Sequence, residues 1–268
     1  MQFKFTNAMN YKVRYAESGD SDKNLLLVHG LGGSAESWIN NADEFAKHFH
    51  VFAPDLIGFG HSDKPKIQYT MKTFTNFLNA FLDAIGLKKT SIVGSSMGGQ
   101  IAAEFAIVHP NKVEKLVLTS PAGIPPREFK GTKELKQYVK VLDAKSLEDV
   151  RKAIIPVDAS EATLSEEHVR SVYEYVTMPG AKDAFLSSLK GSSDAPRLAN
   201  RLKSIKAKTL VIWGKEDRLI PVKYCEPFLT KMDNCRLLII EKCGHRPHAE
   251  KSDLFNKVVS DFLKEDCS

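Results

Sequence analysis

The stretch IVGSSMGGQIAAEF, residues 92–105, begins as an apolar run and continues as a helix-forming segment. Between the two parts lies GSSMG at 94–98, a G-x-S-x-G pattern centred on Ser96. Placed after a strand and before a helix, this pattern puts a serine hydroxyl on a sharp turn above a sheet. Ser95 lacks glycines two positions away on either side, and no lysine follows as in a phosphate-binding loop. The stretch therefore predicts a strand–turn–helix unit with Ser96 as a nucleophile.

Continuous apolar runs of five to seven residues recur along the chain and are typical of buried parallel strands. They cover residues 24–30, 50–55, 90–94, 115–120, 208–214 and 236–241, and two strands around a turn at 7–10 precede them. Helical periodicity lies between most of the runs, as in the apolar stripe at 74–85 that Gly86 follows. Strands that alternate with helices predict an α/β fold with a mostly parallel sheet flanked by helices.

The alternation is interrupted once, between residues 123 and 195. This segment opens with a Pro- and Gly-rich stretch and then shows helical stripes, two of which follow the expected N-caps Ser146 and Ser165. We therefore expect a helical cap at 123–195, inserted after the sixth core strand. Residues 1–122 and 196–268 would form the core.

The composition is that of a soluble globular protein, with 43% hydrophobic and 26% charged residues and a net charge of +5. The basic stretch 197–208 suits a solvated helix better than a nucleic-acid site. No apolar run is long enough to span a membrane, and the N-terminus has no targeting pattern. The four cysteines lie in the last fifth of the chain and are expected to be reduced thiols. These features predict a cytoplasmic protein without nucleic-acid or membrane partners.

A serine nucleophile needs a base and a carboxylate that orients the base. His245 follows the last core strand by four residues, and Asp217 follows the preceding strand by three. The chain order Ser96, Asp217, His245 is the order used by one class of hydrolases. Glu216 is a weaker rival to Asp217, because adjacent side chains point in different directions.

The other histidines have more ordinary interpretations. His248 is expected to begin the final helix. Cys243, His245 and His248 share one loop, but no fourth ligand is evident, so we expect no metal and no other cofactor. Surface positions are expected for His48, His50, His61, His109 and His168.

The chain resembles the α/β-hydrolase superfamily over essentially its full length. The motifs that carry the resemblance are LLLVHGLGGSAESW at 25–38, APDLIGFGHSDKP at 53–65, GSSMGG at 94–99, GKEDRLIP at 214–221 and CGHRPHAE at 243–250. The resemblance implies an oxyanion hole formed by the backbone N–H groups of Leu31 and Met97. It also implies a turn-shaping role for His29 and an architectural role for Asp55. It places the chain in the serine-nucleophile carboxylesterase branch, with similarity to the meta-cleavage-product C–C hydrolases.

Branches of the superfamily that open epoxides or displace halide need a carboxylate at the position of Ser96, so they are disfavoured. The C–C hydrolases usually have Asn before the nucleophile, Trp after the catalytic His and an arginine in the cap. This chain has Ser95 and Arg246 at the first two positions, and Val172, two residues from Arg170, at the third. The sequence therefore favours a serine hydrolase that cleaves carboxylic esters of short to medium acyl chains through an acyl-enzyme. C–C hydrolysis of meta-cleavage dienols is the alternative, and a ligand receptor with slow residual hydrolysis is an alternative of another class.

The expected partner is a small-molecule ester, and the chain is expected to be a monomer or a homodimer. Six residues are predicted to line or cover the substrate pocket: Gly30, Gly32, Phe129, Tyr138, Tyr173 and Phe185.

Overall fold

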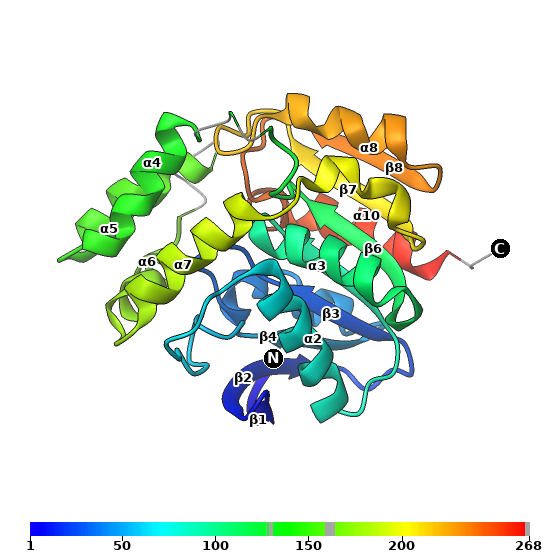
Figure 1. Cartoon of the computed structure of the whole chain (residues 1–268), viewed down its shortest axis with the longest axis horizontal. Helices are drawn as coiled ribbons and strands as arrows, with labels where there is room; N and C mark the ends of the chain where they lie inside the picture. The colour runs from blue at the N-terminus through cyan, green and yellow to red at the C-terminus, as the bar shows by residue number, and fades with distance from the viewer. Residues whose placement is uncertain (127, 129–130, 159–163, 266–268) are drawn as a thin grey trace.

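The computed structural model describes residues 1–126, 128, 131–158 and 164–265. Its centre is an eight-stranded sheet with the order β1-β2-β4-β3-β5-β6-β7-β8 (Figure 1). The strands are β1 (Gln2–Ala8), β2 (Tyr11–Ser18), β3 (Asn24–Val28), β4 (His50–Pro54), β5 (Thr90–Ser95), β6 (Val113–Thr119), β7 (Lys208–Gly214) and β8 (Cys235–Ile240). The β1–β2 and β2–β4 pairs are antiparallel and the others are parallel, so the predicted mostly parallel sheet is confirmed.

Helices cover both faces of the sheet, with α2 and α3 on one face and α10 on the other (Figure 1). The helices are α1 (Ala42–Phe45), α2 (Met71–Ala84), α3 (Met97–Val108), α4 (Lys133–Val139), α5 (Leu147–Ile154), α6 (Glu166–Thr177), α7 (Ala181–Asp194), α8 (Glu226–Lys231), α9 (Pro247–Glu250) and α10 (Ser252–Lys264). Alternate residues of β3 show the two layers. Leu26 packs in the core that contains α2 and α3, while Leu25 and Leu27 pack in the core that contains α10.

The segment between β6 and β7 carries α4, α5, α6 and α7, which lie beside one end of the sheet (Figure 1). Ser146 and Ser165 are N-caps there: their hydroxyls accept the backbone N–H groups of Asp149 and His168. The described part of this segment contains helices and no strand, as the pattern predicts. The exact limits of the cap, 123 and 195, stay a prediction.

The prediction of a single helix at 197–208 is wrong. Two 3-10 turns, Leu198–Asn200 and Leu202–Ser204, replace it, and β7 already begins at Lys208. Leu198 and Leu202 are fully buried, so the chain follows the core surface there. Arg201 pairs with Glu104 of α3, which the charge pattern alone could not predict. None of the helices in the described ranges is long and apolar enough to cross a membrane.

Candidate active site

Ser96 lies between β5 and α3 in a conformation that few non-glycine residues adopt. Its φ is 56° and its ψ is −119°, outside the regions that L-residues favour. Its N–H donates to the carbonyl of Thr119 at 2.9 Å, and its own carbonyl accepts the N–H of Ala122 at 3.0 Å. These bonds to the end of β6 hold the strained turn in place.

The flanking glycines are required by close backbone approach. A Cβ at Gly94 would lie 2.4 Å from the carbonyl oxygen of Gly98. A Cβ at Gly98 would lie 2.3 Å from the carbonyl oxygens of Val28 and His29. Any side chain at either position would therefore push the strand and the helix apart.

Asp217 and His245 come together at the ends of β7 and β8. The Nδ1 of His245 lies 2.8 Å from Oδ2 of Asp217, and both residues are buried. The other carboxylate oxygen, Oδ1, accepts the N–H groups of Leu219 and Ile220, each at 2.9 Å. The carboxylate is thereby fixed with one oxygen left for the imidazole. Its neighbour Glu216 instead accepts the N–H of Cys243 at 2.8 Å.

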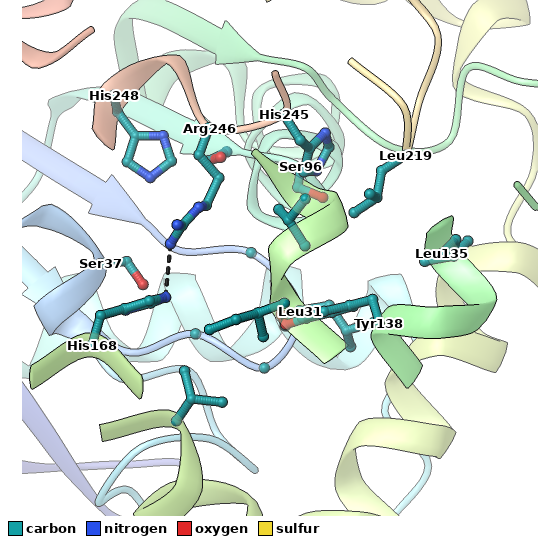
Figure 2. Close-up of a pocket in the computed structure, with 17 residues that line it drawn as sticks. Leu31, Ser37, Ser96, Leu135, Tyr138, His168, Leu219, His245, Arg246 and His248 are labelled. Atoms are coloured by element: carbon teal, nitrogen blue, oxygen red, sulfur yellow. Dashed lines mark hydrogen bonds between the residues drawn. The ribbon is translucent and has the colours of Figure 1, made fainter. Parts of the chain in front are cut away.

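Ser96 and His245 line two cavities that share part of their walls. The smaller has a volume of about 110 Å³ and is drawn in Figure 2. The larger has a volume of about 430 Å³. Both are lined by Leu31, Ser96, Leu135, Leu219 and His245. The expected nucleophile and base thus lie where a small and a large compartment meet.

Leu31 and Met97, the expected oxyanion-hole residues, line the larger cavity beside Ser96. Met97 is the first residue of α3, so its N–H has no acceptor within the helix. The carbonyl of Leu31 accepts the hydroxyl of Tyr138, at 2.7 Å, so α4 of the cap contacts this loop directly.

His29 links this loop to the loop after β4. Its Nε2 accepts the N–H of Leu56 at 3.0 Å, which leaves Nδ1 to donate to the carbonyl of Gly30 at 2.8 Å. Burial lowers the pKa of His29, so the ring stays neutral and keeps this pair of bonds. Its structural environment agrees with the expected turn-shaping role.

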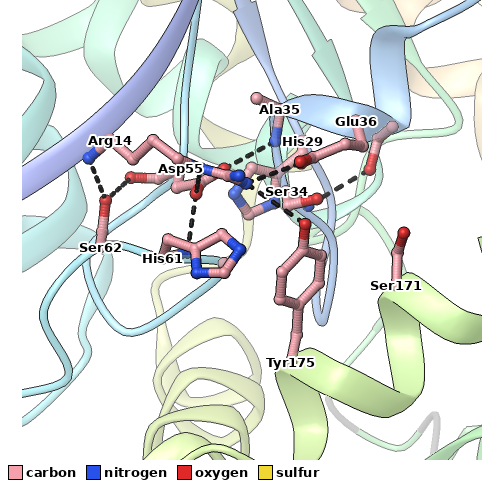
Figure 3. A network of polar contacts seen from close by, with 12 residues as sticks. Arg14, His29, Ser34, Ala35, Glu36, Asp55, His61, Ser62, Ser171 and Tyr175 are labelled. Atoms are coloured by element: carbon pink, nitrogen blue, oxygen red, sulfur yellow. Dashed lines mark hydrogen bonds and ion pairs between the residues drawn. The ribbon is translucent and has the colours of Figure 1, made fainter. Parts of the chain in front are cut away.

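A second set of contacts reaches the same loop from Arg14 of β2 (Figure 3). The guanidinium pairs with Asp55 at 2.6 Å and with Glu36 at 2.7 Å, and one of its N–H groups contacts the hydroxyl of Tyr175 at 3.3 Å. Asp55 also accepts the backbone N–H of Ala35 at 2.8 Å. Tyr175 belongs to α6, so the network joins the cap to the loop that carries Leu31.

The predicted pocket residues have different positions. Gly30, Gly32 and Tyr138 line the smaller cavity. Tyr173 lies in neither cavity, because its hydroxyl bonds the carbonyl of Lys145 within the cap at 3.2 Å. Phe185 is also absent from both walls: it packs behind them against Tyr138, with ring centroids 6.0 Å apart. Phe129 lies outside the described residues.

The smaller cavity also contains a partly buried charge, Arg246, that the sequence did not indicate. The Nε and Nη2 of Arg246 donate to Asp158 at 2.7 and 2.5 Å. Its Nη1 donates to Nε2 of His168 at 2.7 Å, the contact marked by the dashed line in Figure 2. The expected surface position of His168 is therefore wrong: it lines the cavity. Asp158 and His168 belong to the cap, which explains why no local motif indicated this cluster. The only available signal was the position of Arg246 directly after His245.

His248 adds a second imidazole to the wall of the smaller cavity. It is buried against the indole of Trp38, with ring centroids 4.6 Å apart. Burial lowers its pKa to about 3, and the positive charge of Arg246 acts in the same direction. Within the described part of the chain no group bonds its Nδ1.

The lowered pKa of His168 leads to a testable prediction about the stability of the fold. Burial and then the charge of Arg246 lower its pKa to about 4 from the ordinary 6.5. At a pH between these two pKa values the unfolded chain binds more protons than the folded chain. The free energy of unfolding therefore falls as the pH falls. We expect the titration of His168 to lower the free energy of unfolding by about 2 kcal/mol between pH 7 and pH 5. The variant H168Q keeps an acceptor for Arg246. Its free energy of unfolding, measured with urea at pH 7 and pH 5, should fall by about 2 kcal/mol less than that of wild type. The exposed control H48Q should follow wild type, and an H168Q curve parallel to wild type would contradict the prediction.

Comparison with known proteins agrees with this geometry. The alpha/beta hydrolase fold family matches residues 23–252. A 2-hydroxy-6-oxononadienedioate/2-hydroxy-6-oxononatrienedioate hydrolase of Burkholderia vietnamiensis is 31% identical over 94% of this chain and 91% of its own length. A 2-hydroxy-6-oxo-6-phenylhexa-2,4-dienoate hydrolase of Comamonas testosteroni is 29% identical over 96% of this chain and 92% of its own.

Among solved structures, a meta-cleavage product hydrolase of Pseudomonas fluorescens superposes with a TM-score of 0.85 at 26% identity. The match covers 97% of each chain. These relatives bear out hydrolysis as the activity, but their names specify C–C substrates rather than the carboxylic esters that the sequence favoured. The chain belongs to the α/β-hydrolase fold family, and it is a hydrolase.

Proposed function

We propose that this protein hydrolyses a carbon–carbon bond beside a carbonyl group in a substrate that also carries a carboxylate, of the 2-hydroxy-6-oxo-dienoate class. The observation that carries the proposal is the guanidinium of Arg246 in the smaller cavity that Ser96 and His245 line. Its hydrogen bonds to Asp158 and His168 use three of its five N–H groups. The other two are available to a carboxylate.

This assignment accounts for two of the three departures that favoured an ester in the sequence, those at Val172 and Arg246. The cap has Val172 in the cavity wall, while Arg170 is exposed and pairs with Glu166. Arg246 supplies a positive charge from the core side instead. The carboxylate end of the substrate would occupy the smaller cavity and the acyl end the larger one. The scissile bond would then lie over Ser96, and the names of the relatives support the same chemistry.

In this mechanism the substrate first takes its keto form. The electron pair of the carbon–carbon bond that breaks can then be delocalised into the new carbonyl group. The Oγ of Ser96 adds to the carbonyl carbon while His245 takes its proton. The N–H groups of Leu31 and Met97 bind the oxyanion, each contributing about 3 kcal/mol. Collapse of the oxyanion breaks the carbon–carbon bond, and His245 protonates the departing carbon, whose electron pair is delocalised as a dienolate. Water, deprotonated by His245, then releases the acid from Ser96.

Ester hydrolysis is the second candidate. Asp158 already balances the charge of Arg246, and the larger cavity has a mainly apolar wall that fits an acyl chain without a charged anchor. An ester needs only the nucleophile, base and oxyanion donors. A receptor with slow residual turnover would differ from both, because enzymes turn over about 1 to 1,000 times per second.

The two enzyme functions are separated by running a meta-cleavage dienol and 4-nitrophenyl esters of two to eight acyl carbons at equal enzyme concentration. We expect loss of dienol absorbance with kcat/KM above about 10⁴ M⁻¹ s⁻¹. The paired variant D158N/R246Q removes both charges without leaving one unpaired. It should raise KM for the dienol at least tenfold and leave the esters unchanged.

The exposed R170Q variant is the matched control and should behave as wild type. Ester turnover without dienol bleaching would reject C–C hydrolysis in favour of the second candidate. Turnover of both substrates far below about one per second would indicate a receptor.

A further inference from the structure

Leu31, whose N–H is expected to bind the oxyanion, lies in a tight turn. The N–H of Gly33 donates to the carbonyl of Gly30 at 3.1 Å, which places Leu31 and Gly32 at the centre of a β-turn. Of these two central residues only Gly32 has a positive φ, of 72°, and this combination is typical of a type II turn. Type I and type II turns differ in the orientation of the central peptide group, which here joins Leu31 to Gly32.

The core holds the first peptide group of this turn, and the cap holds the second. The carbonyl of Gly30 accepts Nδ1–H of His29 at 2.8 Å as well as the N–H of Gly33, which orients the peptide that carries the N–H of Leu31. The carbonyl of Leu31 belongs to the central peptide and accepts the hydroxyl of Tyr138 at 2.7 Å. Among the described residues no second hydrogen bond reaches this central peptide. Its orientation therefore depends on a side chain of the cap.

Tyr138 lies in direct contact with the turn. A Cβ at Gly32 would lie 2.7 Å from the hydroxyl oxygen of Tyr138 and 2.9 Å from Cε2 of Phe185. The rings of Tyr138 in α4 and Phe185 in α7 pack together, with centroids 6.0 Å apart. Burial raises the pKa of Tyr138 to about 12, so the hydroxyl keeps its proton at neutral pH and can donate it to the carbonyl.

We propose that Tyr138 is a positioning residue for the oxyanion hole: its hydroxyl holds the central peptide of the turn, so that α4 of the cap fixes Leu31 in the orientation that binds the oxyanion. Without this bond, Gly32 allows the central peptide to rotate between the type I and type II orientations. A donor on a mobile turn stabilises a developing negative charge less than a donor that is already in place. This inference rests on the attack by Ser96 in the proposed function, and it applies equally to a C–C bond and to an ester.

The variant Y138F tests the role of the hydroxyl, because it keeps the ring that packs against Phe185. It should lower kcat about tenfold for the dienol and for the 4-nitrophenyl esters, and leave KM unchanged. The matched control is Y173F. The hydroxyl of Tyr173 also bonds a backbone carbonyl, that of Lys145 within the cap, at 3.2 Å, and Y173F should behave as wild type.

A pair of ketones isolates the effect on the oxyanion. The Oγ of Ser96 adds to the carbonyl carbon of 1,1,1-trifluoroheptan-2-one while His245 takes the serine proton, and the carbonyl oxygen becomes the oxyanion of a hemiketal. Heptan-2-one has the same chain and stays a ketone. Dissociation constants measured by calorimetry should rise about tenfold for the trifluoroketone in Y138F. They should stay unchanged for heptan-2-one, and Y173F should change neither.

The outcomes separate a positioning role from other roles of Tyr138. An unchanged kcat in Y138F would overturn the inference, and a raised KM at unchanged kcat would show that the hydroxyl contacts the substrate instead. Equal weakening of both ketones, or the same losses in Y173F, would indicate a loosened cap and would also overturn it. Selective weakening of the trifluoroketone in Y138F supports the inference even if no dienol is bleached and the proposed function fails. Thermal unfolding shows that both variants are folded under the conditions of the assays.

Discussion

Replacement of Ser96 by alanine is expected to lower kcat by a factor on the order of a million, as in other hydrolases with this type of site. Without Oγ no acyl-enzyme can form, and only binding and the oxyanion donors remain to accelerate the reaction. The fold should survive, because both bonds that hold the turn come from the backbone of residue 96. The measurement is kcat on the preferred substrate, with circular dichroism as the check on folding.

Ser95 provides the matched control for this change. It is buried at the end of β5 and lines the smaller cavity, but it lies one residue away from the strained position. S95A should cost far less than S96A. If S96A retained a hundredth of wild-type activity, Ser96 could not be the nucleophile.

The parts of the site that could be predicted are those with a local signature. The turn at Ser96 needs glycines at 94 and 98 because two backbones meet there, and this requirement is visible in five consecutive residues. The positions of Asp217 and His245 are predicted by their distance from the ends of two apolar runs. Parallel strands bring their carboxyl ends to one edge of a sheet, so strand order was sufficient for both.

The parts that could not be predicted depend on contacts between the cap and the core. Arg246 meets Asp158 and His168 across separations of 88 and 78 residues, and nothing in their local sequence marks them as partners. Arg14 and Tyr175 are 161 residues apart. Such pairs follow from how the cap packs on the core, which the helical periodicity of 123–195 does not determine. The prediction of an ester substrate depended on these contacts between the cap and the core, which the sequence does not reveal.

Replacement of Asp217 by asparagine is expected to lower kcat by roughly 10⁴. The reason lies in the two N–H groups that Oδ1 of Asp217 accepts, from Leu219 and Ile220. In D217N these donors select the amide oxygen for their side, so the amide NH₂ faces Nδ1 of His245. The NH₂ group can only donate, which forces the imidazole proton from Nδ1 to Nε2. A ring protonated at Nε2 cannot accept the proton of Ser96.

The control for D217N is E216Q, on the adjacent residue. Glu216 accepts the N–H of Cys243, and glutamine keeps an oxygen for that bond, so E216Q should retain near-normal kcat. D217N should also keep its folded structure, since its amide oxygen still satisfies Leu219 and Ile220. A large loss in E216Q together with a mild effect in D217N would show that the carboxylate is wrongly assigned. A mild effect in both would mean that the tautomer of His245 is set by another group, because the amide in D217N leaves the ring no acceptor at Nδ1.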